Sequence, residues 1–151
     1  MPPKRRASST AQRVRSLIAL DATNVVERLG LRREEMVALF SRLRDRGPLL
    51  AAIESWFPSA TFAELASLEP HEQRGVSQFY ELLGELRWYA RYTEDMPLQV
   101  AQKIDRLIAG LAEGRRLLLA VLEAPVSKGK VVEVTPAKGA MQPRGRARKA
   151  R

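Results

Sequence analysis

The 151-residue sequence contains no cysteine and only one histidine, and aromatic residues make up 6% of it. Without cysteine it has no disulfide framework and no thiolate metal site. The histidine, His71, lies between Pro70 and Glu72, where it fits a helix start better than a catalytic base. No stretch approaches about 18 uninterrupted apolar residues, and no signal-peptide pattern follows the basic N-terminus. We therefore expect a soluble intracellular protein that spans no membrane and holds no metal.

Motifs of catalysis and cofactor binding are also missing from the sequence. It has no phosphate-cradling glycine loop that ends in Lys-Ser or Lys-Thr, no nucleophile elbow, and no acidic spacing typical of a calcium loop. We therefore expect no enzyme activity and no cofactor.

Positive charge is concentrated at the two ends of the chain. The net charge is +9, and residues 1–15 contribute five basic and no acidic side chains. Residues 126–151 contribute eight basic and one acidic side chain, whereas residues 16–125 sum to −3. Long-range attraction to a polyanion must then come from the ends, so we expect a nucleic-acid partner, DNA more than RNA. The alternative is that these ends only aid solubility.

The candidate nucleic-acid contacts at the two ends are basic residues and one glycine. They are Lys4, Arg5, Arg6, Lys128, Lys130, Arg144, Gly145, Arg146, Arg148, Lys149 and Arg151.

Composition divides the chain into a helical domain, residues 10–124, and two disordered basic tails, residues 1–9 and 125–151. The C-terminal tail is rich in Lys, Arg, Gly, Pro and Ala and has no aromatic residue. Such a segment buries too little apolar surface to offset the entropy lost on ordering. Between the tails, apolar residues recur with a helical period, which predicts an all-α fold, a small helical bundle.

Capping and stop signals give the expected helix boundaries. Ser9 or Thr10 would cap a first helix with Val14, Leu17 and Ile18 turned inward. Asp21 or Thr23 would interrupt that helix. Later helices are expected over residues 32–46, from Pro48 to about residue 57, and from a capping box at residues 61–64 to residue 68. Residues 71–92 and 97–123 would then form an antiparallel helical hairpin.

Residues 25–47, VVERLGLRREEMVALFSRLRDRG, resemble the helix-turn-helix of bacterial transcription regulators. Gly30 stands at the position of the turn, and Leu31, Met36 and Leu39 stand at positions that lock the two helices together. The resemblance implies that the outer face of the second helix enters the major groove. The candidate contacts there are Arg32, Arg33 and Arg42. The same pattern also fits an ordinary corner of a bundle, and no β-hairpin wing follows it.

Residues 142–149, QPRGRARK, resemble the AT-hook of the high-mobility-group A proteins. Pro143, Arg144, Gly145 and Arg146 match its Pro-Arg-Gly-Arg core, whereas Ala147 replaces the second proline. The resemblance implies two arginines inserted into the narrow minor groove of A·T-rich DNA. A generic polycationic tail is the alternative interpretation.

These features favour a DNA-binding protein, a transcription regulator or a nucleoid- or chromatin-associated factor, with the helical body as a dimerisation or docking module. Its expected location is the cytoplasm and nucleoid, or the nucleus in a eukaryote. The alternative is a helical adaptor or assembly protein whose body binds a protein partner and whose tail binds nucleic acid or another anionic surface non-specifically. The wide apolar face of residues 97–123 supports that alternative, because it could exceed what one monomer covers.

Overall fold

The computed structural model of the protein describes residues 4–124, with side chains described from residue 9 onward. The elements are α1 (Lys4–Leu31), α2 (Arg33–Leu43), α3 (Gly47–Ala52), a 3₁₀ turn (Phe57–Ser59), α4 (Phe62–Leu65), α5 (Pro70–Tyr92) and α6 (Pro97–Glu123). Residues 4–124 contain no strand, so the prediction of an all-α bundle is confirmed.

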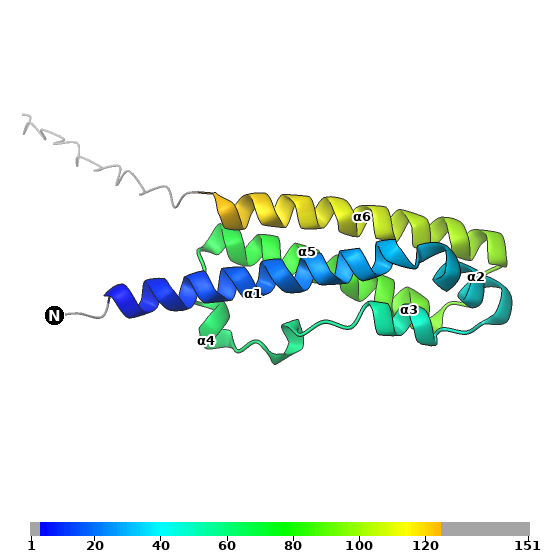
Figure 1. Cartoon of the computed structure of the whole chain (residues 1–151), viewed down its shortest axis with the longest axis horizontal. Helices are drawn as coiled ribbons and strands as arrows, with labels where there is room; N and C mark the ends of the chain where they lie inside the picture. Colours follow the sequence, from blue (N-terminus) through cyan, green and yellow to red (C-terminus); the bar gives the residue numbers. More distant parts are fainter. Residues whose placement is uncertain (1–3, 125–151) are drawn as a thin grey trace, which may run out of the picture.

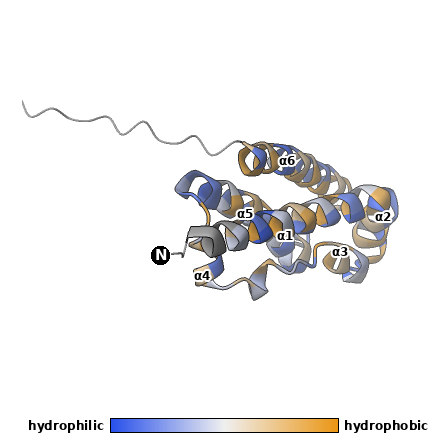
Figure 2. Ribbon diagram, turned by 60° about the vertical axis from the view of Figure 1, so that its left-hand side comes forward, coloured by the Kyte–Doolittle hydropathy of each residue, from blue (hydrophilic) through white to orange (hydrophobic). Residues whose placement is uncertain are grey.

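The two longest C-terminal helices form the predicted antiparallel hairpin. α5 and α6 run side by side, and α1 and α2 pack on another side of α6 (Figure 1). The long helices are amphipathic, since hydrophobic and hydrophilic residues both occur along their length (Figure 2). The apolar face of α6 is therefore covered within a single chain.

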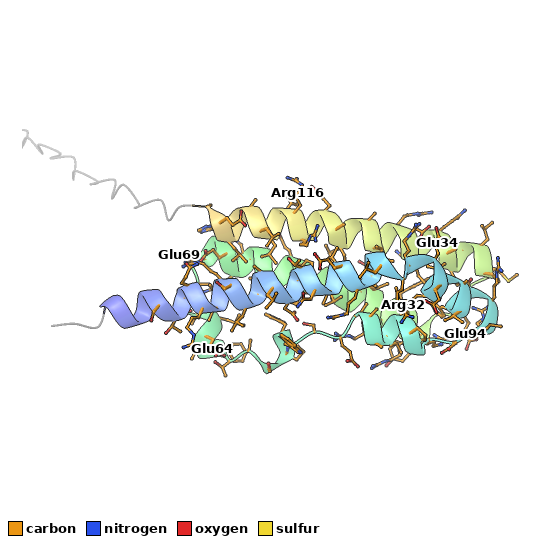
Figure 3. All side chains as sticks on the ribbon, viewed as in Figure 1. Arg32, Glu34, Glu64, Glu69, Glu94 and Arg116 are labelled. Atoms are coloured by element: carbon orange, nitrogen blue, oxygen red, sulfur yellow. The ribbon has the colours of Figure 1, made fainter. Side chains whose placement is uncertain are left out.

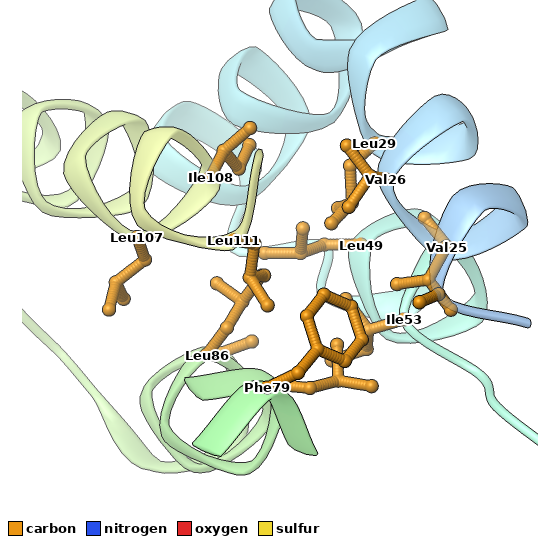
Figure 4. Close-up of a cluster of buried hydrophobic side chains, with 14 of the residues drawn as sticks. Val25, Val26, Leu29, Leu49, Ile53, Phe79, Leu86, Leu107, Ile108 and Leu111 are labelled. Atoms are coloured by element: carbon orange, nitrogen blue, oxygen red, sulfur yellow. The ribbon is translucent and has the colours of Figure 1, made fainter. Parts of the chain in front are cut away.

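The hydrophobic core lies where α1, α2, α3, α5 and α6 meet, and Figure 4 shows a cluster of its side chains. Its largest fully buried apolar side chains are Phe40, Phe79, Leu29, Leu49, Ile53, Leu83, Leu86, Ile104, Leu111, Leu118 and Val25. Burial of each such side chain stabilises the fold by about 1.5–3 kcal/mol relative to its exposed state. Residues from every long helix contribute, so the helices stabilise one another.

α1 differs most from the prediction, because it is one uninterrupted helix. It begins at Lys4, not at Ser9 or Thr10, and it runs through Asp21. The Asp21 carboxylate is buried and accepts hydrogen bonds from the Ser55 hydroxyl (2.7 Å), the Trp56 amide (3.0 Å) and the Tyr80 hydroxyl (2.7 Å). Since these partners satisfy the carboxylate, it does not compete for its own helix backbone. The expected interruption was wrong.

The side of α1 that faces the core was predicted only in part. Val14 and Ile18 are buried as expected, but Leu17 is 58% exposed. At 100° per residue, Leu17 lies about 100° away from Ile18 and so leaves the buried stripe.

Local signals placed several boundaries. The capping box is confirmed: the Glu64 amide donates to the Thr61 hydroxyl at 3.2 Å, and the Thr61 amide donates to Glu64 Oε2 at 2.8 Å. The Thr61 amide and the Thr61 hydroxyl both donate to Glu64 Oε2, and these two bonds lower the pKa of the Glu64 carboxyl. Pro48 lies in the first turn of α3, also as expected. α2 ends at Leu43, earlier than expected, because Arg44 adopts a left-handed conformation (φ 57°) that closes the helix.

Two glycines of α6 generate a stability prediction. A methyl group added at Gly114 would lie 3.0 Å from Leu82 Cδ1, whereas one added at Gly110 would meet no atom within 4 Å. We expect Gly110→Ala to raise the free energy of unfolding by about 1 kcal/mol, because alanine favours the helix. Gly114→Ala should gain less or destabilise. Urea unfolding of both variants tests this, and equal gains would contradict close packing at Gly114.

Candidate nucleic-acid interface

An ion pair fixes the first half of α1 against the start of α5. Arg15 Nε donates to Glu72 Oε1 at 2.7 Å, and its Nη2 donates to Oε2 at 2.9 Å. The side chains of Arg15 and Glu72 are 15% and 3% exposed. The guanidinium lowers the pKa of the Glu72 carboxyl, and Glu72 Oε2 also accepts the Glu69 amide at 2.8 Å in a capping box. The pair therefore locks α1 to α5 and stabilises the first turn of α5.

The last turns of α6 lie against the same end of α5. A methyl group added at Gly75 would lie 3.6 Å from Val121 and 3.7 Å from Leu118. Gly75 is only three residues beyond Glu72, the partner of Arg15. α1, at Arg15, and the last turns of α6 therefore both contact the start of α5, and the beginning of α1 and the end of α6 lie at the same end of the bundle (Figure 1).

Both basic segments of the sequence join the described bundle at this end, which we call the basic end. Lys4, Arg5 and Arg6 belong to the first turns of α1. The chain leaves α6 at Glu123 and continues into residues 126–151, with their eight basic side chains. The candidate residues from Lys128 to Arg151 lie outside the described part of the chain. Composition predicted the basic segments, but their common exit is a tertiary feature with no local signal in the sequence.

Several arginines of the helical body are held in contacts within the protein. Arg46 donates to the carbonyl oxygens of Ala90 (2.8 Å) and Thr93 (2.7 Å), at the C-terminus of α5. Arg28 donates to the carbonyl oxygens of Ala52 (3.2 Å) and Glu54. These donors satisfy carbonyl groups that a helix end leaves without an intrahelical partner. Such guanidinium groups support the fold and are less available to an external anion.

The arginines of the helix-turn-helix resemblance lie away from the basic end. Arg32 lies at the opposite end of the bundle from Glu64 and Glu69 (Figure 3). It pairs with Glu35 at 3.2 Å, and both side chains are exposed. Arg33 pairs with Asp105 of α6 at 2.6 Å. Arg42, in the last turn of α2, is exposed. Arg32 and the start of α1 therefore lie toward opposite ends of the bundle.

The geometry around Gly30 also differs from the expected turn. α1 continues through Gly30 to Leu31, and only Arg32 separates it from α2. Leu31 is 84% exposed, so it does not lock the two helices together, whereas Met36 is buried. α2 packs against α3 and α6. The expected turn at Gly30 was wrong, and the helix-turn-helix resemblance itself stays a prediction.

Comparisons with known proteins add no relative to this description. No family model, no curated protein and no solved structure matches the chain. Among residues 4–124 no helix is long and apolar enough to cross a membrane. The same residues contain no cluster of three or more His, Cys, Asp or Glu side chains suited to a metal ion.

The Arg15–Glu72 pair predicts a specific loss of stability. Glu72→Gln should lower the free energy of unfolding by about 3 kcal/mol, because it leaves a largely buried guanidinium without its counter-charge. Glu113→Gln is the matched control: its partner Arg116 and Glu113 itself are exposed, so its cost should stay below about 1 kcal/mol. Equal effects of the two substitutions in denaturant unfolding would contradict this role for Glu72.

The same pair predicts a dependence of stability on pH. The pKa of Glu72 is lower in the folded protein than its ordinary value of 4.5. Its contribution is therefore complete above that ordinary value and is lost as the pH falls through the folded-state pKa. Unfolding curves between neutral and acidic pH should show this loss in the natural protein and a smaller one in Glu72→Gln.

Proposed function

We propose that the protein binds nucleic acid, DNA in preference to RNA, through the basic segments 1–15 and 126–151. One observation carries the proposal: the two segments join the bundle at the same end, while residues 16–125 have a net charge of −3. A polyanion approaching the basic end meets positive charge from both segments, and it meets weak repulsion elsewhere.

Two segments on one rigid body favour simultaneous binding. Once one segment contacts a nucleic acid, the other is held near the same strand, so its binding becomes an intramolecular step. The ordered α1 and the Arg15–Glu72 pair support this argument, because they fix the first segment to the body. Each phosphate neutralised on duplex DNA releases counterions, which makes the affinity strongly salt-dependent.

The C-terminal segment makes the protein selective for A·T-rich DNA. Its Pro-Arg-Gly-Arg core, residues 143–146, resembles an AT-hook and would read groove width more than base identity. This supports a sequence-tolerant role, either regulatory or architectural, on nucleoid or chromatin DNA. A location at the nucleoid, or in the nucleus of a eukaryote, belongs to the same proposal.

The adaptor alternative loses the observation that first favoured it. The apolar residues of α6, including Val100, Ile104 and Leu111, are buried against α1, α2 and α5 of the same chain. This face therefore needs no protein partner to cover it.

Charge removal at matched positions tests the proposal. We expect the triple substitution of Lys4, Arg5 and Arg6 by Gln to weaken binding to a short DNA duplex and to reduce the salt slope by about 0.9 for each phosphate that is no longer neutralised. Deletion of residues 126–151 should weaken binding roughly tenfold or more near 0.1 M salt. Fluorescence anisotropy across a salt series gives both quantities, and an RNA duplex measured in parallel tests the preference for DNA.

The control removes the same charge from the body. Arg44 directly follows α2, and Arg91 and Arg106 lie on α5 and α6; all three are exposed. Their joint substitution by Gln should leave affinity and salt slope nearly unchanged. If the triple substitution in the body weakens binding as much as the triple substitution of Lys4, Arg5 and Arg6 does, the affinity depends on net charge or on the body surface. If deletion of residues 126–151 changes neither quantity, the proposal fails.

The hook-like core predicts a selectivity effect that is separable from affinity. Arg144→Gln with Arg146→Gln should reduce the preference for A·T-rich over G·C-rich duplexes. Lys128→Gln with Lys130→Gln removes the same charge outside the core and should weaken both duplexes alike. Competition assays with the two duplexes measure this, and equal changes in selectivity would contradict minor-groove reading by the core.

A further inference from the structure

α1 has an exposed stripe opposite the core. Leu17 and Leu20, both on this stripe, are 58% and 49% exposed. Arg13 and Glu27 are also exposed, and each lies seven residues from Leu20 on nearly the same line of the helix. Val25 and Leu29 on the opposite side are fully buried. The stripe therefore places two leucines between a positive and a negative charge.

An apolar groove borders this stripe on one side. It has a volume of about 300 Å³ and lies between α1 and the segment of residues 56–60. Its walls include Val14, Leu17 and Ile18 of α1, and Phe57 and Trp56 on the other side. The Trp56 side chain is 68% exposed. The stripe and the groove share Leu17 and together form an exposed, mainly apolar surface, which we call the α1 surface.

We propose that the α1 surface binds a second copy of this chain, with the two α1 helices antiparallel and the two-fold axis at Leu20. About this axis, residue 13 of one copy faces residue 27 of the other. Both lie about 10.5 Å from Leu20 along the helix, from the rise of 1.5 Å per residue. The interface therefore contains two Arg13–Glu27 ion pairs related by symmetry, as a self-complementary contact requires.

Charge decides the direction of the two helices. A parallel arrangement in register would place Arg13 beside Arg13 and Glu27 beside Glu27, which is repulsive at both places. The antiparallel arrangement makes both contacts attractive. Glu64 already attracts Arg13 at longer range, but its carboxylate is held by the capping box with Thr61. Leu17 of each copy borders the groove of its own chain, so the partner helix also covers that apolar wall.

The pairing fixes the distance between the two basic ends. Lys4 lies 16 residues from Leu20, so the first turns of the two α1 helices point in opposite directions, about 48 Å apart along the shared axis. This spacing bears on nucleic-acid binding and rests on the proposed function. Self-association through α1 does not depend on it.

Substitution of Leu20 tests the surface directly in the full chain. Leu20→Lys places two like charges on the axis and should weaken self-association at least roughly tenfold. Leu117→Lys is the matched control, because Leu117 is a leucine of α6 that is 51% exposed, and its self-association should equal that of the natural protein. Sedimentation velocity after nuclease treatment measures both, with circular dichroism to verify folding. A natural protein that stays monomeric over the accessible concentrations overturns the proposal, as does an unchanged Leu20→Lys dimer.

Charge reversal tests the register. Arg13→Glu alone and Glu27→Arg alone should each weaken the dimer about tenfold, since each creates two repulsive contacts. The double variant exchanges the two charges and should recover the natural dissociation constant within about threefold. Failure of the double variant to recover would overturn the antiparallel register.

A cross-link tests the axis independently of affinity. The chain has no cysteine, so Leu20→Cys introduces a single thiol that faces its own copy on the axis. Oxidation should give a disulfide-linked dimer in high yield, and Leu117→Cys should give little. Equal yields would overturn the assignment. If the natural protein dimerises but does not bind nucleic acid, that result counts against the proposed function alone.

Discussion

The apolar face of α6 is the surface on which the rest of the molecule depends. Residues such as Ile104, Leu111 and Leu118 are almost inaccessible to solvent because α5 covers one side of that face while α1 and α2 cover another. Because α5 and α6 are antiparallel and the long α1 packs along them, the start of α1 and the end of α6 have few possible positions. The exit of α6 and the start of α1 then fall at the same end, so burial of one helix face determines where the basic segments meet.

Polar interactions within the body serve the same packing. Glu72 is nearly inaccessible and would be costly as an isolated charge, but Arg15 and the Glu69 amide satisfy it. Asp21 is satisfied by three neutral donors, and these attach the segment after α3 to α1. Arginines of the body are held in the same way, Arg33 by Asp105 and Arg28 and Arg46 by carbonyl oxygens near helix ends.

Interactions between residues close in the sequence could be predicted from the sequence, and pairings between distant residues could not. The Thr61–Glu64 capping box and the Pro48 start join residues at most three positions apart, so propensity alone predicts them. The partners of Asp21 are 34 to 59 residues away, and Asp105 is 72 residues from Arg33. For that reason the sequence alone predicts a helix interruption at Asp21 and a free arginine at position 33. Composition identified the basic segments, but their convergence required the tertiary packing of α6.

Because α1 is continuous, one helix carries basic residues in its first turns, contributes side chains to the core and presents the exposed Leu20. A break at Asp21 would have allowed the first turns to move independently of the core, and ordering them on a partner would then cost conformational entropy. Instead, one helix of 28 residues begins with Lys4, buries Val25 and Leu29, and exposes Leu20. Any contact made at the first turns or at Leu20 is held in fixed geometry to the core. The buried Asp21 carboxylate, satisfied from outside its own helix, is the feature that permits this continuity.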